Sequence, residues 1–340
     1  MKNKEITQRK TKILATLGPS SNTIKKIVEL SKAGASAFRL NCSHLNEKSL
    51  KEYVRKIRRA EKILNKPIGI LVDLQGPKIR IGKVSDSENL LKIGSVFVLD
   101  LKKHIGNYKR VTLPHKKIFS SLRKGHLILL DDGKIHLKVT SVKADEIRTK
   151  VLQGGYLKSN KGVNLPETNI KTSVLSSKDK HFANIAVQEG VDWIALSFVQ
   201  KPNDIKELRK ICSNKVSIMA KIEKPSALDY IDEIANLADG IMIARGDLGV
   251  ELPIESVPGW QKKIIRVARV KGKPVVVSTQ MLESMTSSLT PTRAEVSDVA
   301  NAVFEGADAI MLSAESASGD YPIETVKMMN KIAINIEKDS

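Results

Sequence analysis

The 340-residue sequence has few cysteines, few aromatic residues and no long apolar run. Its two cysteines, Cys42 and Cys212, are too few for a disulfide framework or a zinc cluster and fit a reducing compartment. Aromatic residues make up 4% of the chain, which leaves few platforms for stacking nucleic-acid bases. No apolar run reaches the roughly 18 residues that span a bilayer, and the N-terminal stretch lacks the apolar core of a secretory signal. We therefore expect a cytoplasmic protein that binds neither nucleic acid nor membrane.

Acidic residues are also scarce relative to basic ones. Lys and Arg total 57 against 37 Asp and Glu, which gives a formal net charge of +20. The positive charge is spread along the chain without a basic arm, and this favours small anionic substrates. Apolar residues make up 41% of the chain, so the length suits one large domain with a smaller one.

Short apolar runs recur along the chain, and most are followed by an amphipathic helical pattern. Their near-continuous apolarity is typical of parallel strands that are buried on both faces. The runs span 12–16, 36–40, 68–73, 193–197, 217–222, 240–244, 274–278 and 309–313. The helical patterns span 22–33, 46–65, 178–189, 203–212, 227–237, 259–271, 293–305 and 323–337. Ser21 is expected to cap the first helix and Gly34 to end it. Eight strand–helix units predict a (β/α)8 TIM barrel.

One connection is much longer than the others. About 90 residues, 77–166, separate the third strand from its helix. Within them apolar and polar residues alternate over 134–139, after an Asp132-Gly133 turn, as in an antiparallel hairpin. We expect a small antiparallel β-barrel lid at 77–166, inserted between barrel segments 1–76 and 167–340. Those two segments together have about 250 residues, the usual size of a TIM barrel.

Reacting groups in a TIM barrel sit at the carboxyl ends of the strands. In this sequence the strand ends carry both cations and carboxylates. They are Arg39, Asn41, Ser43, Asp73, Ser197, Lys221, Glu223, Arg245, Asp247, Thr279, Ser313 and Glu315. The mouth of the barrel is therefore expected to hold carboxylates and cations close together.

Two motifs at these ends indicate a metal and an anion. Lys221 and Glu223 in AKIEKP lie two residues apart on a strand and so point the same way, either as a plain ion pair or as part of a site. Asp247 lies between glycines in ARGDLGVELP, where a short helix would aim free N–H groups at an anion. Glu223 and Asp247, without His or Cys nearby, suit Mg²⁺ or Mn²⁺. The hydroxyl of Thr279 either belongs to the same site or only forms a hydrogen bond to the backbone at the end of its strand.

Together these groups predict a site for a phosphorylated carboxylic acid. The metal would take carboxylate and phosphate oxygens, and the helix N-terminus would take the carboxylate. Lys221 and Arg39 would neutralise the phosphoryl group. Phosphoryl transfer needs mainly this positioning and charge stabilisation.

A series of longer motifs runs along the chain. They are RLNCSH, DLQGPKIR, KGVNLP, AKIEKP, MIARGDLGVELP, STQMLESM, PTRAEVSDVANAVFEGADAIMLSAES and GDYPIETV. With these motifs in this order, the sequence resembles the pyruvate kinase family from residue 11 to about 328. The resemblance covers the barrel and the inserted lid. It implies phosphoryl transfer from phosphoenolpyruvate to ADP, giving pyruvate and ATP in the last step of glycolysis.

The resemblance also implies roles for the matching residues. The catalytic residues would be Lys221, Thr279 and Arg39. The contacts to phosphoenolpyruvate would come from Arg39, Lys221, Gly246, Asp247 and Thr279. The nucleotide would be bordered by Asn41, Cys42, Ser43, His44, Arg80 and Lys161. Mg²⁺ would be bound by Glu223 and Asp247. The monovalent-cation site, which holds potassium in the family, would be formed by Asn41, Ser43, Asp73 and Leu74. The proton for the enolate is expected from Thr279 through water, with Ser313 and Glu315 as further members of that chain.

The sequence departs from the family pattern in two places. Lys78 stands where the family commonly has Glu, and its ammonium is expected to replace potassium beside Asp73. The alternative is that Lys78 is a lysine at the hinge of the lid whose ammonium contacts only solvent. The chain also stops at Ser340, where members usually continue into a C-terminal domain that carries the effector site. We therefore expect hyperbolic kinetics without effector activation. We also expect homo-oligomers that form through the barrel helices.

Other interpretations compete with an active kinase. A Mg²⁺-dependent lyase acting on a pyruvate enolate would use Glu223 and Asp247, but it needs neither a lid nor nucleotide cations. An inactive or fragmentary relative, kept as a basic barrel for binding a partner, would be favoured by loss of Lys221, Glu223, Asp247 or Thr279. All four are present.

Overall fold

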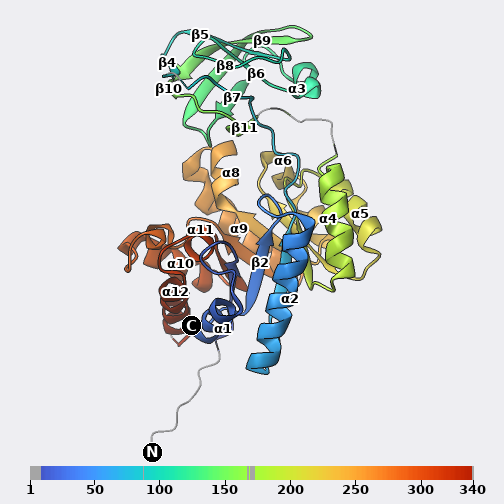
Figure 1. Ribbon diagram of the computed structural model, residues 1–340, viewed down its shortest axis with the longest axis vertical. Coiled ribbons are helices and arrows are strands. Elements are labelled where there is room, and N and C mark those ends of the chain that lie inside the picture. The colour runs from blue at the N-terminus through green and yellow to red at the C-terminus, as the bar shows by residue number, and fades with distance from the viewer. Residues whose placement is uncertain (1–8, 87, 167, 169–172, 339–340) are drawn as a thin grey trace, which may run out of the picture.

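The computed structural model describes residues 9–86, 88–166, 168 and 173–338, and they form a barrel and a smaller β domain (Figure 1). The barrel strands are β1 (Lys12–Thr16), β2 (Ala37–Asn41), β3 (Gly69–Asp73), β12 (Trp193–Leu196), β13 (Ser217–Ile222), β14 (Gly240–Ala244), β15 (Val275–Ser278) and β16 (Ala309–Leu312). They close in the order β1-β16-β15-β14-β13-β12-β3-β2, and every neighbouring pair is parallel. The predicted (β/α)8 fold is confirmed.

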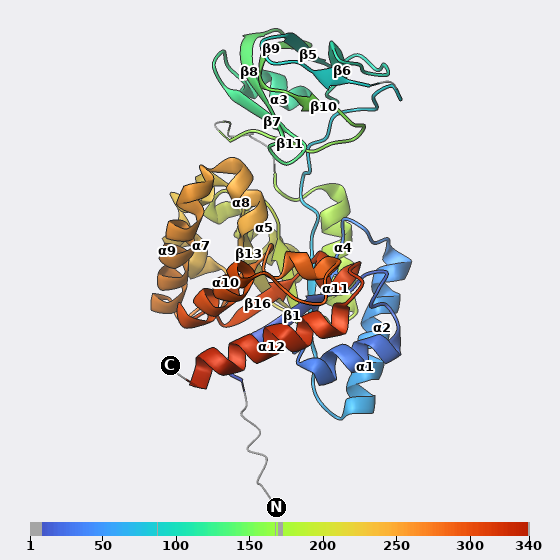
Figure 2. The same cartoon turned by 90° about the vertical axis from the view of Figure 1, so that its left-hand side faces the viewer.

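Helices surround the barrel and connect its strands (Figure 2). The connecting helices are α1 (Ile24–Ala33), α2 (Glu47–Leu64), α4 (Ser177–Gln188), α5 (Pro202–Cys212), α6 (Pro225–Leu228), α7 (Ile231–Leu237), α9 (Val257–Val270), α10 (Arg293–Phe304) and α12 (Pro322–Lys338). Shorter turns at the mouth are α8 (Arg245–Glu251), η1 (Ile254–Ser256), η2 (Glu283–Thr286) and α11 (Ala314–Ala317).

Two local expectations about these helices were wrong. Thr23, not Ser21, caps α1, because the Thr23 side chain accepts the backbone N–H of Lys26. Ser21 instead accepts the N–H of Gly18 in the preceding turn. The pattern over 227–237 predicted one helix, but the chain forms the separate helices α6 and α7. Gly34 ends α1 with φ 131°, as expected of a glycine cap.

The lid is a sheet that lies outside the barrel. Its strands and helix are β4 (Leu90–Leu91), β5 (Val96–Asp100), β6 (Arg110–Thr112), α3 (Lys116–Ser121), β7 (Leu127–Leu130), β8 (Ile135–Val142), β9 (Glu146–Gln153), β10 (Gly155–Tyr156) and β11 (Val163–Asn164). Six strands pair in the order β11-β7-β8-β9-β5-β6, and β4 pairs with β10. The sheet is mainly antiparallel, as expected, but β5 and β6 are parallel. Gly133 has φ 82° in the turn that joins β7 to β8.

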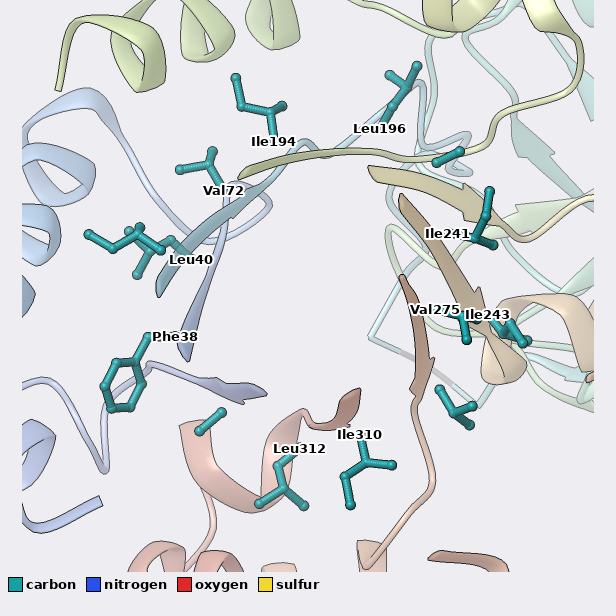
Figure 3. Close-up of a cluster of buried hydrophobic side chains, with 14 of the residues drawn as sticks. Phe38, Leu40, Val72, Ile194, Leu196, Ile241, Ile243, Val275, Ile310 and Leu312 are labelled. Atoms are coloured by element: carbon teal, nitrogen blue, oxygen red, sulfur yellow. The ribbon is translucent and has the colours of Figure 1, made fainter. Parts of the chain in front are cut away.

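The chain has separate cores for its two parts. Strand residues that face outward pack against the helices, among them Phe38, Ile194 and Ile310 (Figure 3). A smaller apolar cluster, which includes Met219 and Met242, fills the inside of the barrel. The lid has its own cluster, and Figures 1 and 2 show it standing over one end of the barrel. Among the described residues, no helix is long and apolar enough to cross a membrane.

Candidate active site at the barrel mouth

The alternation of side chains along the strands places the candidate residues inside the barrel. Leu40 on β2 and Val72 on β3 point outward toward the helices (Figure 3). Arg39 and Asp73, next to them in sequence, therefore point inward at the end of the barrel. Lys221 on β13 does the same and meets Asp73 across the mouth. A period of two, read from the sequence, is thus enough to explain why these charges converge.

Lys221 is the centre of the site. Its Nζ lies 2.9 Å from Glu223 Oε1 and 3.1 Å from Asp73 Oδ1, and it donates to Ser197 Oγ at 2.7 Å. The Lys221 side chain is 9% exposed, and both carboxylates are 1% exposed. The ion pair foreseen as the plain alternative therefore exists, but it belongs to a larger buried network. Ser197 also donates to the carbonyl of Leu74 at 2.7 Å, which fixes its hydroxyl.

Arg39 is the second cation of the network. Its Nε lies 2.7 Å from Asp73 Oδ2, and its Nη1 donates to Thr16 Oγ1 at 3.2 Å. Asp73 therefore holds two cations, Lys221 on one oxygen and Arg39 on the other. A buried carboxylate in this position orients both positive groups toward the open end of the barrel.

The charges of these groups are set by one another. Burial favours a higher pKa for Asp73, but Lys221 and Arg39 outweigh it and lower the pKa of this carboxyl. Burial opposes a charged Lys221, yet Asp73 and Glu223 raise its pKa well above the usual value. Burial, together with the charge of Asp247, raises the pKa of Glu223 despite Lys221. Lys221 is therefore protonated at neutral pH, and Glu223 and Asp247 are close enough to repel each other.

The positions of Glu223 and Asp247 fit a metal site. Asp247 lies in the first turn of α8, directly after β14, and Glu223 directly follows β13. Glu223 Oε2 accepts the backbone N–H of Phe198 at 2.7 Å, which fixes its orientation. Two adjacent carboxylates without His or Cys form an all-oxygen donor set, which suits Mg²⁺ or Mn²⁺ when substrate oxygens complete the shell. A cluster of three or more such ligands is absent from the described part of the chain.

Thr279 lies in a strained turn at the end of β15. Its φ is 69° and that of Gln280 is 54°, a left-handed conformation that is unusual for a β-branched residue. The Thr279 hydroxyl accepts the N–H of Gly246 at 2.7 Å, so the two groups lie together. Arg245 donates from Nη2 to the carbonyls of Thr279 at 2.7 Å and Gln280 at 3.2 Å. Asp298 holds the same guanidinium through Nη1 at 2.6 Å.

Arg245→Lys is therefore expected to lower kcat by about 10²-fold, the cost of misplacing a reacting group by about 1 Å. The reason is that one ammonium cannot hold two carbonyls and Asp298 at once. The KM for phosphoenolpyruvate should change far less, and the measurement is steady-state kinetics beside Arg266→Lys, an exposed arginine on α9. An equal effect of both changes, or none of Arg245→Lys, would refute this role.

The residues expected to border the nucleotide lie in two places. Asn41 to His44 form a turn after β2, in which His44 donates its N–H to the Asn41 carbonyl at 3.1 Å. The Cys42 side chain is buried in the barrel core, so any contact it makes with a nucleotide is through its backbone. Arg80 is exposed on the lid, where its Nη1 donates to the carbonyl of Asn160 at 2.8 Å. Lys161 is paired with Asp131 within the lid at 2.7 Å.

The residues expected at the monovalent-cation site are close together, but Lys78 is not bound to them. Asn41 Oδ1 accepts the N–H of Ser43 at 3.1 Å, and Leu74 directly follows Asp73. In the described part of the chain no ion pair or hydrogen bond joins Lys78 to Asp73. Lys78 is half-buried and lines a cavity of about 480 Å³ between the lid and the barrel.

This cavity also contains residues to which the sequence assigned no role. They include His115, Lys116, Lys117, Lys178, Phe198 and Lys224. Asp247 lies on its wall as well, so the cavity joins the mouth of the barrel. His115 to Lys117 come from the lid, and only the folded chain brings them over the barrel. The one sign of these residues in the sequence was its excess of Lys, and composition does not indicate which lysines face the site.

Comparisons with known proteins agree with this fold. The family model described as pyruvate kinase, barrel domain, matches residues 8–326. A pyruvate kinase of Methylorubrum extorquens is 53% identical, over 98% of this chain and 70% of the relative. A pyruvate kinase of Agrobacterium vitis is 48% identical, over 97% of this chain and 70% of the relative. A pyruvate kinase of Geobacillus stearothermophilus is 42% identical, over 97% of this chain and 57% of the relative. The crystal structure of a pyruvate kinase from Cryptosporidium parvum superposes with a TM-score of 0.95 at 36% identity, over 99% of this chain and 71% of that one. The chain therefore belongs to the pyruvate kinase family, the phosphotransferases that make pyruvate and ATP from phosphoenolpyruvate and ADP.

Proposed function

We propose that phosphoryl transfer takes place between Lys221, Arg39 and the carboxylate pair Glu223 and Asp247. The observation that carries this proposal is the buried position of Lys221, whose charge is held by Asp73 and Glu223. A fixed cation that needs no reorganisation is what a migrating phosphoryl group requires. Mg²⁺ or Mn²⁺, when bound by Glu223 and Asp247, supplies further positive charge to phosphoryl and carboxylate oxygens.

The substrate carboxylate is assigned to the start of α8. The N–H groups of Gly246 and Asp247 and the hydroxyl of Thr279 would hold it, since Gly246 and Thr279 already lie 2.7 Å apart. A Cβ on Gly246 would lie 3.4 Å from Thr279 Oγ1, in van der Waals contact with that hydroxyl. The phosphoryl group then faces Lys221 and Arg39. This orientation places the two ends of phosphoenolpyruvate on different strands of the mouth.

The enolate that remains after transfer needs a proton, and Thr279 is our first candidate to deliver it through water. Its hydroxyl donates to the carbonyl of Ser278 at 2.5 Å. Glu315 lies behind this turn and accepts the N–H of Ser313 at 2.7 Å and that of Leu282 at 3.4 Å. Burial raises the pKa of Glu315, which suits a group that relays a proton. Lys221 is a poor donor, because its carboxylate neighbours keep it charged.

The nucleotide is assigned to the cleft under the lid, where Arg80 and Lys161 would meet the ADP phosphates. In this proposal Lys161 leaves its ion pair with Asp131 and binds an ADP phosphate when the nucleotide enters. We assign the lid to residues 77–166 and the barrel to 1–76 and 167–340. The ends of these ranges at residues 1, 167 and 340 lie outside the described residues.

We further propose that Lys78 makes potassium unnecessary. In support, a lysine occupies this position five residues after Asp73, on the segment that leads into the lid. Among the described residues, the ion-pair partners of Asp73 in the present lid position are Arg39 and Lys221, both of which the phosphoryl group would engage. Lys78 borders the same cavity and has a flexible four-carbon stem, so it can move toward the potassium ligands as the lid closes.

A second copy of the chain is expected to pack against the barrel helices. Val270 on α9 is 78% exposed and Phe304 on α10 is 74% exposed, and both line one hollow on the outer surface. Light scattering on the purified chain should give the mass of an oligomer, and Phe304→Asp should lower it toward that of one chain. A monomeric parent would overturn this assignment.

The activity itself is tested by a coupled assay of pyruvate formation. Pyruvate should form from phosphoenolpyruvate only when both ADP and Mg²⁺ are present, with a potassium-free buffer. Pyruvate formation without ADP would instead support a lyase or phosphatase. Absence of any turnover would favour an inactive relative.

A further inference from the structure

The lid meets the barrel at one end of α8. Asn164 on β11 donates from Nδ2 to Glu251 Oε1 at 2.8 Å. Among the described residues, this is the one side-chain hydrogen bond that joins a lid strand to a barrel helix or strand. A Cβ on Gly133, in the turn between β7 and β8, would lie 3.6 Å from the side chain of Val250. Two separate parts of the lid therefore approach neighbouring residues at the end of α8, Val250 and Glu251.

Glu251 is an unusual residue for this position. Its side chain is 1% exposed, and it ends α8, where a negative charge opposes the helix dipole. Lys224 lies 2.5 Å from Oε1, the same oxygen that accepts Asn164. The other oxygen, Oε2, is buried and has no hydrogen-bond partner in the described part of the chain. A buried carboxylate oxygen without a hydrogen-bond partner lowers the stability of the fold. We therefore expect Glu251 to have a functional role.

Lys224 and Glu251 both lie close in sequence to a proposed metal ligand. Lys224 directly follows Glu223, and Glu251 ends the same seven-residue helix whose first turn holds Asp247. On the lid, Asn164 lies three residues after Lys161 in KGVNLP. The contact therefore connects the lid segment that carries Lys161 and Asn164 with the two barrel segments that carry the proposed metal carboxylates.

We propose that Glu251 is a positioning residue that docks the lid, with Asn164 as its lid partner and Lys224 as its counterion. The contact sets how the lid approaches the metal side of the mouth and so where the ADP phosphates meet phosphoenolpyruvate. The inference rests on the proposed function, because it assumes that the lid carries nucleotide-binding residues. Glu251 itself touches no reacting atom.

The kinetic test is Asn164→Asp, which places a carboxylate against Glu251. The KM for ADP should rise by about 10-fold, the equivalent of losing a hydrogen bond to a charged group. The dissociation constant of phosphoenolpyruvate with Mg²⁺, measured calorimetrically without nucleotide, should stay within about 2-fold, because its contacts lie in the barrel. The matched control is Gln153→Ala, which removes a lid amide whose bond to the Lys134 carbonyl stays within the lid.

A double-mutant cycle tests the pair directly. Asn164→Ala and Glu251→Gln should each raise the KM for ADP, and the double variant should be no worse than the poorer single variant. That non-additivity is expected only when the two side chains act through each other. Effects that multiply would mean that the residues act separately, and would overturn the proposal.

A distance measurement separates the docking contact from the activity. Nitroxide labels at Lys138→Cys on β8 and Lys206→Cys on α5 report the position of the lid, since both sites are exposed. Both native cysteines are buried, and burial raises the pKa of both thiols, that of Cys212 to about 11, so the introduced cysteines react first. The distance distribution should broaden in Asn164→Asp and stay unchanged in Gln153→Ala.

The KM for ADP and the distance distribution together show which part of the proposal fails. An unchanged distribution in Asn164→Asp would overturn the docking role, whatever the kinetics. A broadened distribution with an unchanged KM for ADP would overturn its link to the nucleotide. If the parent chain lacked kinase activity while the distribution broadened as expected, the proposed function would fail and the contact would stand. Equal losses of phosphoenolpyruvate and ADP affinity with a lower melting temperature would indicate a structural role only, and would also overturn the proposal.

Discussion

Lys221→Met is expected to lower kcat by about 10³-fold, the usual loss when one preorganised donor to a developing charge is removed. Methionine keeps most of the length of the side chain but removes the charge that Asp73 and Glu223 hold in place. Arg39 and the bound metal remain, so some turnover should persist. The KM for ADP should change little, because the ADP phosphates are assigned to Arg80 and Lys161 on the lid. The measurement is the steady-state rate of pyruvate formation.

The fold of this variant has to be checked, because Lys221 compensates two buried carboxylates. Removing one partner of such a group costs about 3–5 kcal/mol of unfolding free energy. Lys221→Arg provides a second variant that keeps the charge, and it should still lose at least about 10²-fold in kcat, because a guanidinium cannot reproduce the bond to Ser197. Lys215→Met, an exposed lysine just before β13, is the control and should behave like the parent. Near-parental kcat in folded Lys221→Met would remove Lys221 from the mechanism.

Lys78→Glu is expected to turn a potassium-independent enzyme into a potassium-dependent one. Without potassium, the variant should lose about 10²-fold or more in rate, since a carboxylate in place of Lys78 removes the proposed cation and leaves the negative charge of the potassium ligands uncompensated near the phosphoryl group. Added potassium should restore most of that rate, because Asn41, Ser43, Asp73 and the Leu74 carbonyl would then bind it. The parent should show the same rate with and without potassium. Rates are compared at constant ionic strength with an inert cation.

The control for this change is Lys83→Glu, an exposed lid residue that alters the net charge by the same amount. It should keep the potassium independence of the parent. A parent enzyme whose rate falls sharply without potassium would contradict the role of Lys78. The same holds for a Lys78→Glu variant that potassium does not rescue.

The barrel could be predicted from the sequence because its strands are short and apolar and end at polar residues. The strand at 217–222 has the predicted bounds, and the strand expected at 68–73 begins one residue later. The same regularity explains the site. Lys221 and Glu223 were expected to share one face because they are two residues apart, and both lie in the mouth near Asp73. Periodicity acts over a few residues, and a closed barrel then brings the strand ends together.

Features that depend on distant contacts could not be predicted in this way. No local pattern indicates that Thr279 adopts φ 69°, since its carbonyl is bound by Arg245 at the start of α8. Nothing in KGVNLP indicates that Asn164 meets Glu251, because the position of the lid decides that contact. In each case the partner lies in another part of the chain.

We propose that this barrel mouth moves a phosphoryl group from phosphoenolpyruvate to ADP. Phosphorus-31 NMR of the purified 340-residue chain with phosphoenolpyruvate, ADP and Mg²⁺, in potassium-free buffer, follows that transfer. The phosphoenolpyruvate signal should be replaced by the γ-phosphate signal of ATP, one for one with pyruvate formed. Release of inorganic phosphate in place of ATP, or a phosphoenolpyruvate signal that does not change, would contradict it.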